Sequence, residues 1–341
     1  MKVLVSGASG FVGREVVSEL SSAGFEIYQT SRSKLSADKQ NSKIHGSFIT
    51  ADITVYENLK VFEKFGQIDA VVHCAGLAHQ FSEIDAEKFT AVNVKGTENI
   101  LKLSLKLRAK QFILISSTAV YGIKKTSGNK KYKAPDFVID ENAVCQPETF
   151  YAGSKLEAEG KAIEFCEKNN IALTILRLAP VIGEGNMGNV ERLIEAIDKG
   201  RFFWIGKGEN LKSLIYKNDV ARACGKILTQ KTGATEIFNL AAKPIKMFDF
   251  VSLIAQQLGK EIPKFSIPAE LFEFLFKVKD KLPKVKKIDR LLKTIEKWLS
   301  DDVYSADKIA EVYNFRTKIS IEQAIERQID WYKKQKVSRQ K

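Results

Sequence analysis

The chain has 341 residues, of which 44% are apolar and 28% are charged, an ordinary balance for a folded soluble protein. This length allows one or two domains with a large buried core, so wholesale disorder, collagen-like repeats and small disulfide-stapled scaffolds are excluded. The formal net charge of +13 favours anionic partners such as nucleotides, nucleic acid or acidic lipid headgroups, without choosing among them.

The cysteines and the apolar runs indicate the compartment. The cysteines are far apart and include no CxxC pair, so neither a metal site nor a disulfide framework is expected; they are Cys74, Cys145, Cys166 and Cys224. The first residues do not form a signal peptide, and no apolar run reaches the roughly 18 residues of a membrane span. We therefore expect a cytoplasmic protein without a spanning segment.

The first half of the chain alternates strand and helix patterns. Short buried runs predict strands at Val3–Ser6, Glu26–Thr30, Ala70–Cys74, Phe112–Ser116 and Leu173–Leu178. Helical periodicity between them covers Arg14–Ala23, Ala86–Leu107 and Ser154–Lys168. This alternation predicts an α/β fold with a Rossmann-type, doubly wound parallel sheet. The lysine-rich stretch 124–133 is expected to be an exposed loop.

The second half has a weaker pattern. Residues 189–199 and 219–229 are expected to be helical, and the chain from Lys260 onward is mostly helical, polar and rich in lysine. We expect a dinucleotide-binding domain over residues 1–178, with 211–245 returning to it. Residues 179–210 and 246–341 would then form a smaller, mainly helical substrate-binding lobe.

A glycine-rich turn joins the first strand to the first helix. Gly7, Gly10 and Gly13 are spaced GxxGxxG, with Phe11 and Val12 opening the helix. Glycines permit a tight turn and a close approach of backbone to pyrophosphate, and the helix N-terminus supplies free N–H groups. The motif predicts a dinucleotide site, the alternative being a purely structural turn.

The end of the second strand carries no acidic residue. A carboxylate is usual there when the ribose hydroxyls of NAD are bound, whereas Ser31 and Arg32 follow the strand here. Arg32 can pair with a 2′-phosphate, so NADP(H) is favoured and NAD(H) is the alternative, in which Arg32 is simply solvated.

Tyr151 and Lys155 are four residues apart at a predicted helix start, which places both on one helical face. A nearby ammonium favours the tyrosine phenolate, so Tyr151 can exchange a proton with a substrate hydroxyl while hydride is transferred. Ser117 follows a predicted strand and can hydrogen-bond the reacting oxygen. These three residues are the candidate catalytic trio.

Six motifs in order carry a family resemblance: GASGFVG, ADI at 51–53, HCAG at 73–76, VNVKGT at 92–97, SSTAVYG at 116–122 and YAGSK at 151–155. The chain resembles the extended short-chain dehydrogenase/reductases, in their NAD-dependent epimerase/dehydratase branch. The resemblance assigns the catalytic role to Ser117, Tyr151 and Lys155. It also implies that Asp52 and Ile53 contact adenine, that Ala75 and Gly76 line the cofactor, and that Pro180 and Val181 lie beside the nicotinamide amide. Asn93 matches the asparagine that shapes the active-site helix and is a further expected cofactor residue.

The resemblance also implies a nucleotide-sugar substrate, and not a nucleic acid. Asn189 and Val190 resemble the start of the helix over the diphosphate, and Lys212 occupies the position of a basic diphosphate ligand. Phe203 and Ile205 resemble residues that flank uracil, the alternative being core packing. Two weaker candidates are Arg290 as a second phosphate ligand and His79 near the sugar, the latter equally compatible with an exposed loop.

Related sugar dehydratases carry an Asp-Glu pair where this chain has Thr118 and Ala119, which disfavours dehydration. We therefore expect redox chemistry at carbon 4 of a UDP-hexose or UDP-N-acetylhexosamine, as 4-epimerase or 4-ketoreductase, in surface-polysaccharide synthesis. The alternatives are reduction of a non-sugar carbonyl and a non-catalytic NADP-binding protein, the latter disfavoured by the intact trio. A homodimer is also expected.

A basic stretch at 277–297 is interleaved with apolar residues and interrupted by Pro283. Such a stretch can lie on an anionic membrane. The plainer interpretation, which we prefer, is a lysine-rich surface helix over the pocket.

Overall fold

Seven parallel strands form the central sheet of the protein. The computed structural model describes residues 1–33, 45–78, 86–122, 138–230, 233–262, 264–268 and 295–340. The strands run in the order β11-β6-β5-β4-β1-β2-β3. Their bounds are β1 Lys2–Ser6, β2 Glu26–Ser31, β3 Gly46–Thr50, β4 Ala70–His73, β5 Gln111–Ser117, β6 Ala172–Leu178 and β11 Glu236–Leu240. The strand order reverses between β1 and β4, and open α/β sheets bind ligands at such a point.

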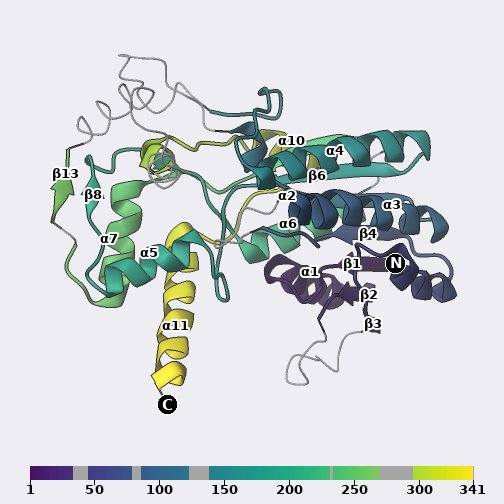
Figure 1. The fold of residues 1–341 in the computed structure, drawn as a ribbon, viewed down its shortest axis with the longest axis horizontal. Coiled ribbons are helices and arrows are strands. Elements are labelled where there is room, and N and C mark those ends of the chain that lie inside the picture. The colour runs from purple at the N-terminus through teal and green to yellow at the C-terminus, as the bar shows by residue number, and fades with distance from the viewer. Residues whose placement is uncertain are drawn as a thin grey trace.

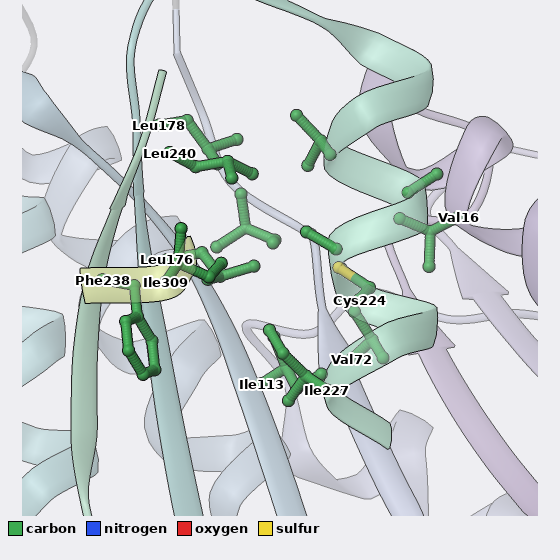
Figure 2. Packing of buried hydrophobic residues seen from close by; sticks show 14 of the residues in the cluster. Val16, Val72, Ile113, Leu176, Leu178, Cys224, Ile227, Phe238, Leu240 and Ile309 are labelled. Carbon is green, nitrogen blue, oxygen red and sulfur yellow. The ribbon is translucent and has the colours of Figure 1, made fainter. Parts of the chain in front are cut away.

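Helices cover both faces of the sheet, because alternate strand residues point to opposite sides. Val3 and Val5 of β1 belong to the apolar cluster under α1 and α6, whereas Leu4 belongs to the cluster under α3 and α4. Figure 2 shows Cys224 and Ile227 of α6 facing strand residues such as Val72 and Ile113. The helices concerned are α1 Phe11–Ser22, α3 Gly96–Lys106, α4 Phe150–Lys168 and α6 Lys217–Thr229, with the 3₁₀ segments η2 Tyr56–Phe65 and η4 Thr118–Tyr121.

The helix expected over residues 86–107 is broken into three parts. They are α2 Ala86–Phe89, the π-helical segment η3 Thr90–Lys95, and α3. The wider π turn contains Asn93, whose side chain is hydrogen-bonded outside the helix, to Leu77 and Ser154. Short π segments of this kind occur often at functional sites. The helix expected from Ser154 begins earlier, at Phe150, because the Thr149 hydroxyl caps it by accepting from the Ala152 N–H at 3.1 Å.

A second, smaller lobe lies at one end of the longest axis (Figure 1). Its helices are α5 Asn189–Asp198, α7 Met247–Leu258 and α11 Ile321–Gln340, and its core includes Ile194, Trp204, Phe250 and Ile325. Short strand pairs complete it: β8 Trp204–Ile205 with β13 Ser266–Ile267, β9 Leu211–Lys212 with β12 Ile245–Lys246, and β7 Val181–Ile182 with β10 Ile215–Tyr216. The sequence analysis did not predict α7 or these short strands.

Segments from the second half of the chain return to the central sheet. Residues 236–240 pair with β6 as β11, α6 packs beside α1, and α10 Asp307–Tyr313 contributes Ile309 to the same core (Figure 2). The Rossmann-type sheet and the helical C-terminal lobe are confirmed, while the exact domain bounds stay a prediction. Among the described residues, none of the helices has the length and apolar character needed to cross a membrane.

Candidate active site

The glycine turn packs so tightly that larger residues do not fit. A Cβ on Gly13 would lie 2.1 Å from the Gly7 carbonyl oxygen, and one on Gly7, where φ is +70°, would lie 2.6 Å from the Ala75 backbone nitrogen. Gly10 begins α1 without a side-chain cap, and no acidic residue lies in the first turn. The N–H groups of this turn are therefore suited to an anion such as pyrophosphate.

The end of β2 offers hydroxyl groups and one cation. Ser31 is buried and its hydroxyl is hydrogen-bonded to that of Ser9 in the glycine turn. Arg32 is exposed and has no hydrogen-bond or ion-pair partner among the described residues. The buried Thr30 hydroxyl also lacks a partner there. Among the described residues, this edge thus presents the exposed Arg32 guanidinium near the glycine turn.

The three residues of the candidate catalytic trio converge at the carboxyl end of β5. Ser117 ends that strand, and Tyr151 and Lys155 lie one turn apart at the start of α4. The Lys155 ammonium donates to the Ile115 carbonyl at 2.9 Å, which ties α4 to β5. Burial raises the pKa of Tyr151, and its hydrogen bond with Ser117 acts in the opposite direction. The Tyr151 hydroxyl is thus hydrogen-bonded to Ser117 in a buried setting.

Burial lowers the pKa of Lys155 to about 8, with the neighbouring charge of Glu159 acting against it. A Cβ on Gly76 would lie 3.0 Å from the Lys155 ammonium and 3.3 Å from the Asn93 amide oxygen. The absence of a side chain at Gly76 therefore leaves room beside the Lys155 ammonium and the Asn93 amide. Since Gly7 contacts Ala75, the glycine turn and the trio are parts of one continuous site.

Asn93 holds the loop after β4 against α4. Its amide oxygen accepts from the Leu77 N–H at 2.7 Å, and its nitrogen donates to the Leu77 carbonyl at 3.1 Å and to the Ser154 hydroxyl at 2.9 Å. The side chain is buried, so these bonds satisfy it fully. Asn93 thus fixes the helix that carries Tyr151 relative to Ala75 and Gly76.

The remaining expected cofactor residues lie after β3 and at the start of β7. Asp52 accepts from the backbone and hydroxyl of Thr54 at 2.9 and 2.8 Å through one carboxylate oxygen. Ile53 is buried and packs at Gly96, where a Cβ would come within 2.6 Å of it. Pro180 is exposed, and its carbonyl accepts from Ile215 at 3.1 Å beside half-buried Val181. Their contacts with a cofactor stay a prediction.

The expected substrate residues separate into different environments. Asn189 is exposed in the first turn of α5, whose N-cap residue has no side-chain cap, and Val190 is buried. Ile205 is buried in the second lobe, whereas Phe203 is 45% exposed with its ring 6.5 Å from that of Phe265. His79 and Arg290 lie outside the described residues, as does the loop at 124–133.

Lys212 holds its ammonium in an ion pair, and its expected contact with a diphosphate stays a prediction. It forms an ion pair with Asp302 at 2.7 Å and also donates to the Lys297 carbonyl at 2.8 Å. Both paired side chains are largely buried. The positive charge is therefore already neutralised by a residue 90 positions away in the sequence, and this pairing favours a structural role.

A buried polar network beside the trio was missed by the sequence analysis. Arg177 of β6 binds both carboxylate oxygens of Glu159, and Ser116 donates to the same carboxylate at 2.5 Å. Arg177 also donates to the Tyr121 hydroxyl at 2.9 Å. The sequence feature that could have indicated this network is the position of Glu159, one helical turn after Lys155.

The comparisons with known proteins agree with this geometry. The model of the NAD dependent epimerase/dehydratase family matches residues 3–241. The chain belongs to that family. The resemblance inferred from the six motifs is thereby confirmed, and the protein is an NAD-dependent epimerase/dehydratase enzyme.

Several curated epimerases are similar to this family member. N-acetyl-α-D-glucosaminyl-diphospho-ditrans,octacis-undecaprenol 4-epimerase of Escherichia coli O157:H7 is 32% identical over 272 residues, 79% of this chain and 76% of that protein. UDP-glucose 4-epimerase of Vibrio cholerae is 26% identical over 299 residues, 86% of each chain. A solved UDP-glucose 4-epimerase of Thermotoga maritima with UDP-glucose has a TM-score of 0.76 at 21% identity, covering 98% of this chain and 99% of that one, which supports the fold alone.

Proposed function

We propose that this enzyme carries out redox chemistry at carbon 4 of a sugar joined to a diphosphate, as a 4-epimerase or 4-ketoreductase. The observation that carries the proposal is the convergence of Ser117, Tyr151 and Lys155 at the carboxyl end of β5, next to the glycine turn. The Escherichia coli relative that acts as a 4-epimerase supports the same chemistry.

A nicotinamide cofactor held at the glycine turn would supply the hydride chemistry at the sugar carbon. Tyr151 takes the proton of the sugar hydroxyl in oxidation and gives it back in reduction. Ser117 bonds the Tyr151 hydroxyl and is placed to hold the reacting oxygen. The Lys155 ammonium, fixed on the Ile115 carbonyl, favours the phenolate by its charge.

The residues after Ser117 disfavour loss of water from the sugar. Thr118 is buried and its hydroxyl donates to the Leu178 carbonyl at 3.2 Å, and Ala119 has no polar side chain. Neither residue can act as an acid or base at neutral pH. Neither position therefore provides an acid or a base for the loss of water. Epimerisation and reduction are the reactions that remain.

The residues at the glycine turn fit a dinucleotide, and we propose that NADP(H) is preferred over NAD(H). The glycine contacts and the uncapped start of α1 suit the pyrophosphate. Arg32 is exposed beside hydroxyl-bearing Ser31, and its guanidinium can pair with a 2′-phosphate. NAD(H) is the alternative, since the family is described as NAD-dependent.

For the substrate we propose an N-acetylhexosamine or hexose on a diphosphate carried either by uridine or by a polyprenol. Asn189 lies exposed in the first turn of α5, where the backbone N–H groups lack a side-chain cap. Such a helix end suits a phosphate. The two carriers correspond to those named for the curated relatives. We further propose a role in surface-polysaccharide synthesis, with which either carrier is compatible.

The deciding experiment is incubation of the full chain with each carrier and each cofactor. The substrates are UDP-glucose, UDP-N-acetylglucosamine, a 4-keto-6-deoxy UDP-sugar and polyprenyl-diphospho-N-acetylglucosamine, with products identified by NMR. Inversion at carbon 4 supports the epimerase, and reduction of the keto sugar with loss of reduced cofactor supports the ketoreductase. Turnover of none of them would overturn the proposal.

A further inference from the structure

The outer end of the second lobe exposes a group of apolar side chains. Phe248 of α7, Ile262 and Phe265 expose 43%, 41% and 68% of their surface. We call these three residues the outer patch. They come from the start of α7 and from the chain just before β13. In Figure 1, β8 and β13 lie at the extreme end of the molecule's longest axis, opposite the central sheet.

The outer patch rests on a fixed aromatic base. Trp204 of β8 is buried and stacks on Phe248 with 5.6 Å between ring centroids. Its backbone N–H donates to the Phe265 carbonyl at 2.9 Å. Trp204, Phe248 and Ile262 line a single open cleft of about 720 Å³. The side chains are thus held at the surface by packing and backbone pairing.

Two lysines and one glutamate, Glu261, line the same cleft. Lys207 is exposed, and Lys264 pairs with Glu261 at 3.2 Å in an ion pair whose side chains are both 86% exposed. Water screens such a pair strongly, so Lys264 can still meet an external anion. Protein–protein interfaces are depleted in lysine, whereas anionic membranes attract it. Apolar side chains with lysines beside them therefore fit a lipid surface better than a protein partner.

The described residues on both sides of the basic stretch 277–297 are anchored at this end. On one side, β13 pairs with β8. On the other, the Trp298 ring lies 5.7 Å from that of Phe202, which in turn lies 5.0 Å from Trp204. Most of the stretch itself lies outside the described residues.

We propose that the outer patch docks this enzyme on the surface of an anionic phospholipid bilayer. The apolar side chains of Phe248, Ile262 and Phe265 enter the headgroup layer, and Lys207 and Lys264 meet the lipid phosphates. The proposal deepens the proposed function, on which it rests for the substrate: a polyprenyl-linked sugar diphosphate is presented at such a surface.

Vesicle sedimentation with the full chain tests the proposal without any substrate. We expect binding to vesicles of phosphatidylglycerol mixed with phosphatidylcholine, weakening as salt is added, and little binding to phosphatidylcholine alone. Ile262→Ser with Phe265→Ser should remove most of the binding. Lys207→Gln with Lys264→Gln should weaken it about thirtyfold at low salt, since each lysine near such a surface contributes about 1 kcal/mol.

A matched control is available at the end of α3. Leu105 is 43% exposed and Lys106 follows it, also exposed, so Leu105→Ser with Lys106→Gln changes similar groups elsewhere on the molecule. This variant should bind vesicles like the unaltered protein. Circular dichroism and turnover of a water-soluble UDP-sugar check that the outer-patch variants are folded.

Several outcomes would overturn the docking proposal. The first is that the protein does not bind anionic vesicles, and the second is that the outer-patch and lysine variants still bind them. The third is a patch-dependent change in oligomeric state without vesicle binding, which would make the patch a self-association surface. Patch-dependent vesicle binding supports the proposal even if no sugar is turned over, in which case the proposed function alone fails.

Discussion

Glu159 of α4 and Arg177 of β6 form a buried ion pair beside the catalytic trio. The Arg177 Nη2 lies 2.7 Å from one carboxylate oxygen, and its Nε lies 3.2 Å from both. Ser116, the neighbour of Ser117, donates to the same carboxylate, and Lys155 precedes Glu159 by one helical turn. One carboxylate thus joins the strand that ends in the serine to the helix that carries Tyr151 and Lys155.

Glu159→Gln should therefore change both stability and pH dependence. Removing one partner leaves Arg177 buried without its counter-charge, which costs about 3–5 kcal/mol of unfolding free energy. The Glu159 charge raises the pKa of Lys155, which is about 8, so its loss lowers that pKa. Lys155 then loses its proton at lower pH, and the alkaline fall in kcat/KM moves to lower pH.

The control for this change is Glu157→Gln, an exposed position on the same helix. Urea unfolding and a pH profile of sugar reduction should both match those of the unaltered protein. If Glu159→Gln destabilises the fold but leaves the alkaline limb in place, the pair is structural only.

Tyr151→Phe should reduce turnover by about 10²–10⁴-fold, because it removes the proton-exchanging oxygen and keeps the ring. Its ring centroid lies 6.1 Å from that of Phe89, a contact that phenylalanine preserves. Cofactor affinity, measured by fluorescence titration, should stay near that of the unaltered enzyme. Turnover within a few-fold of the original would exclude Tyr151 as the acid and base.

Arg32→Ser should weaken NADPH binding and leave NADH binding unchanged. The exposed guanidinium at the end of β2 is the group available to a 2′-phosphate. A charge-assisted bond contributes about 1.5–3 kcal/mol, or roughly 10- to 150-fold in affinity. Titration of both cofactors against both proteins is the measurement. Equal losses for the two cofactors, or tighter binding of NADH by the unaltered enzyme, would contradict an NADP preference.

Lys212→Met and Asp302→Asn should each destabilise the fold by about 1–3 kcal/mol, because each leaves a largely buried partner unpaired. The double variant should cost less than the sum, as in a pair that interacts directly. We expect the Michaelis constant for a UDP-sugar to respond similarly in both single variants. A rise confined to Lys212→Met would instead show that Lys212 contacts the diphosphate.

His73 should make the protein sensitive to acid. Its ring is buried between the hydroxyls of Ser6 at 2.5 Å and Thr97 at 3.0 Å, and burial lowers its pKa to about 3. The unfolded chain takes up a proton near pH 6.5 while the folded chain does not, so stability is present above that pH and lost on acidification. The loss from this group is about 1.4 kcal/mol per pH unit between pH 6.5 and 3.

Urea unfolding at pH 7 and pH 5 measures this loss. His73→Gln keeps a polar side chain at the position but cannot titrate, so the difference between the two pH values should shrink by about 2 kcal/mol. Exposed His45→Gln is the matched control and should leave the difference unchanged. If the free energy of unfolding of His73→Gln still differs between pH 7 and pH 5 as in the unaltered protein, the acid sensitivity comes from carboxylates instead.

The features that the sequence alone determined are local ones. Two of them involve only residues that are close together in the sequence. They are the glycine spacing at Gly7, Gly10 and Gly13 and the four-residue spacing of Tyr151 and Lys155. The alternation of strand and helix segments likewise predicted the parallel sheet, because parallel strands need a crossover connection, usually a helix. From these, the fold class, the glycine turn and the trio were predictable, and the family was named from motif order.

Only the tertiary structure decided which distant groups meet. Lys212 pairs with Asp302, Glu159 with Arg177, and Phe248 lies in one cleft with Ile262. The π-helical turn at Asn93 also depends on a bond to Leu77, 16 residues away. Such pairings depend on the strand register and on where distant segments pack against the sheet. The stabilisation that each pair gives depends on its burial, which arises only when the helices and strands pack together.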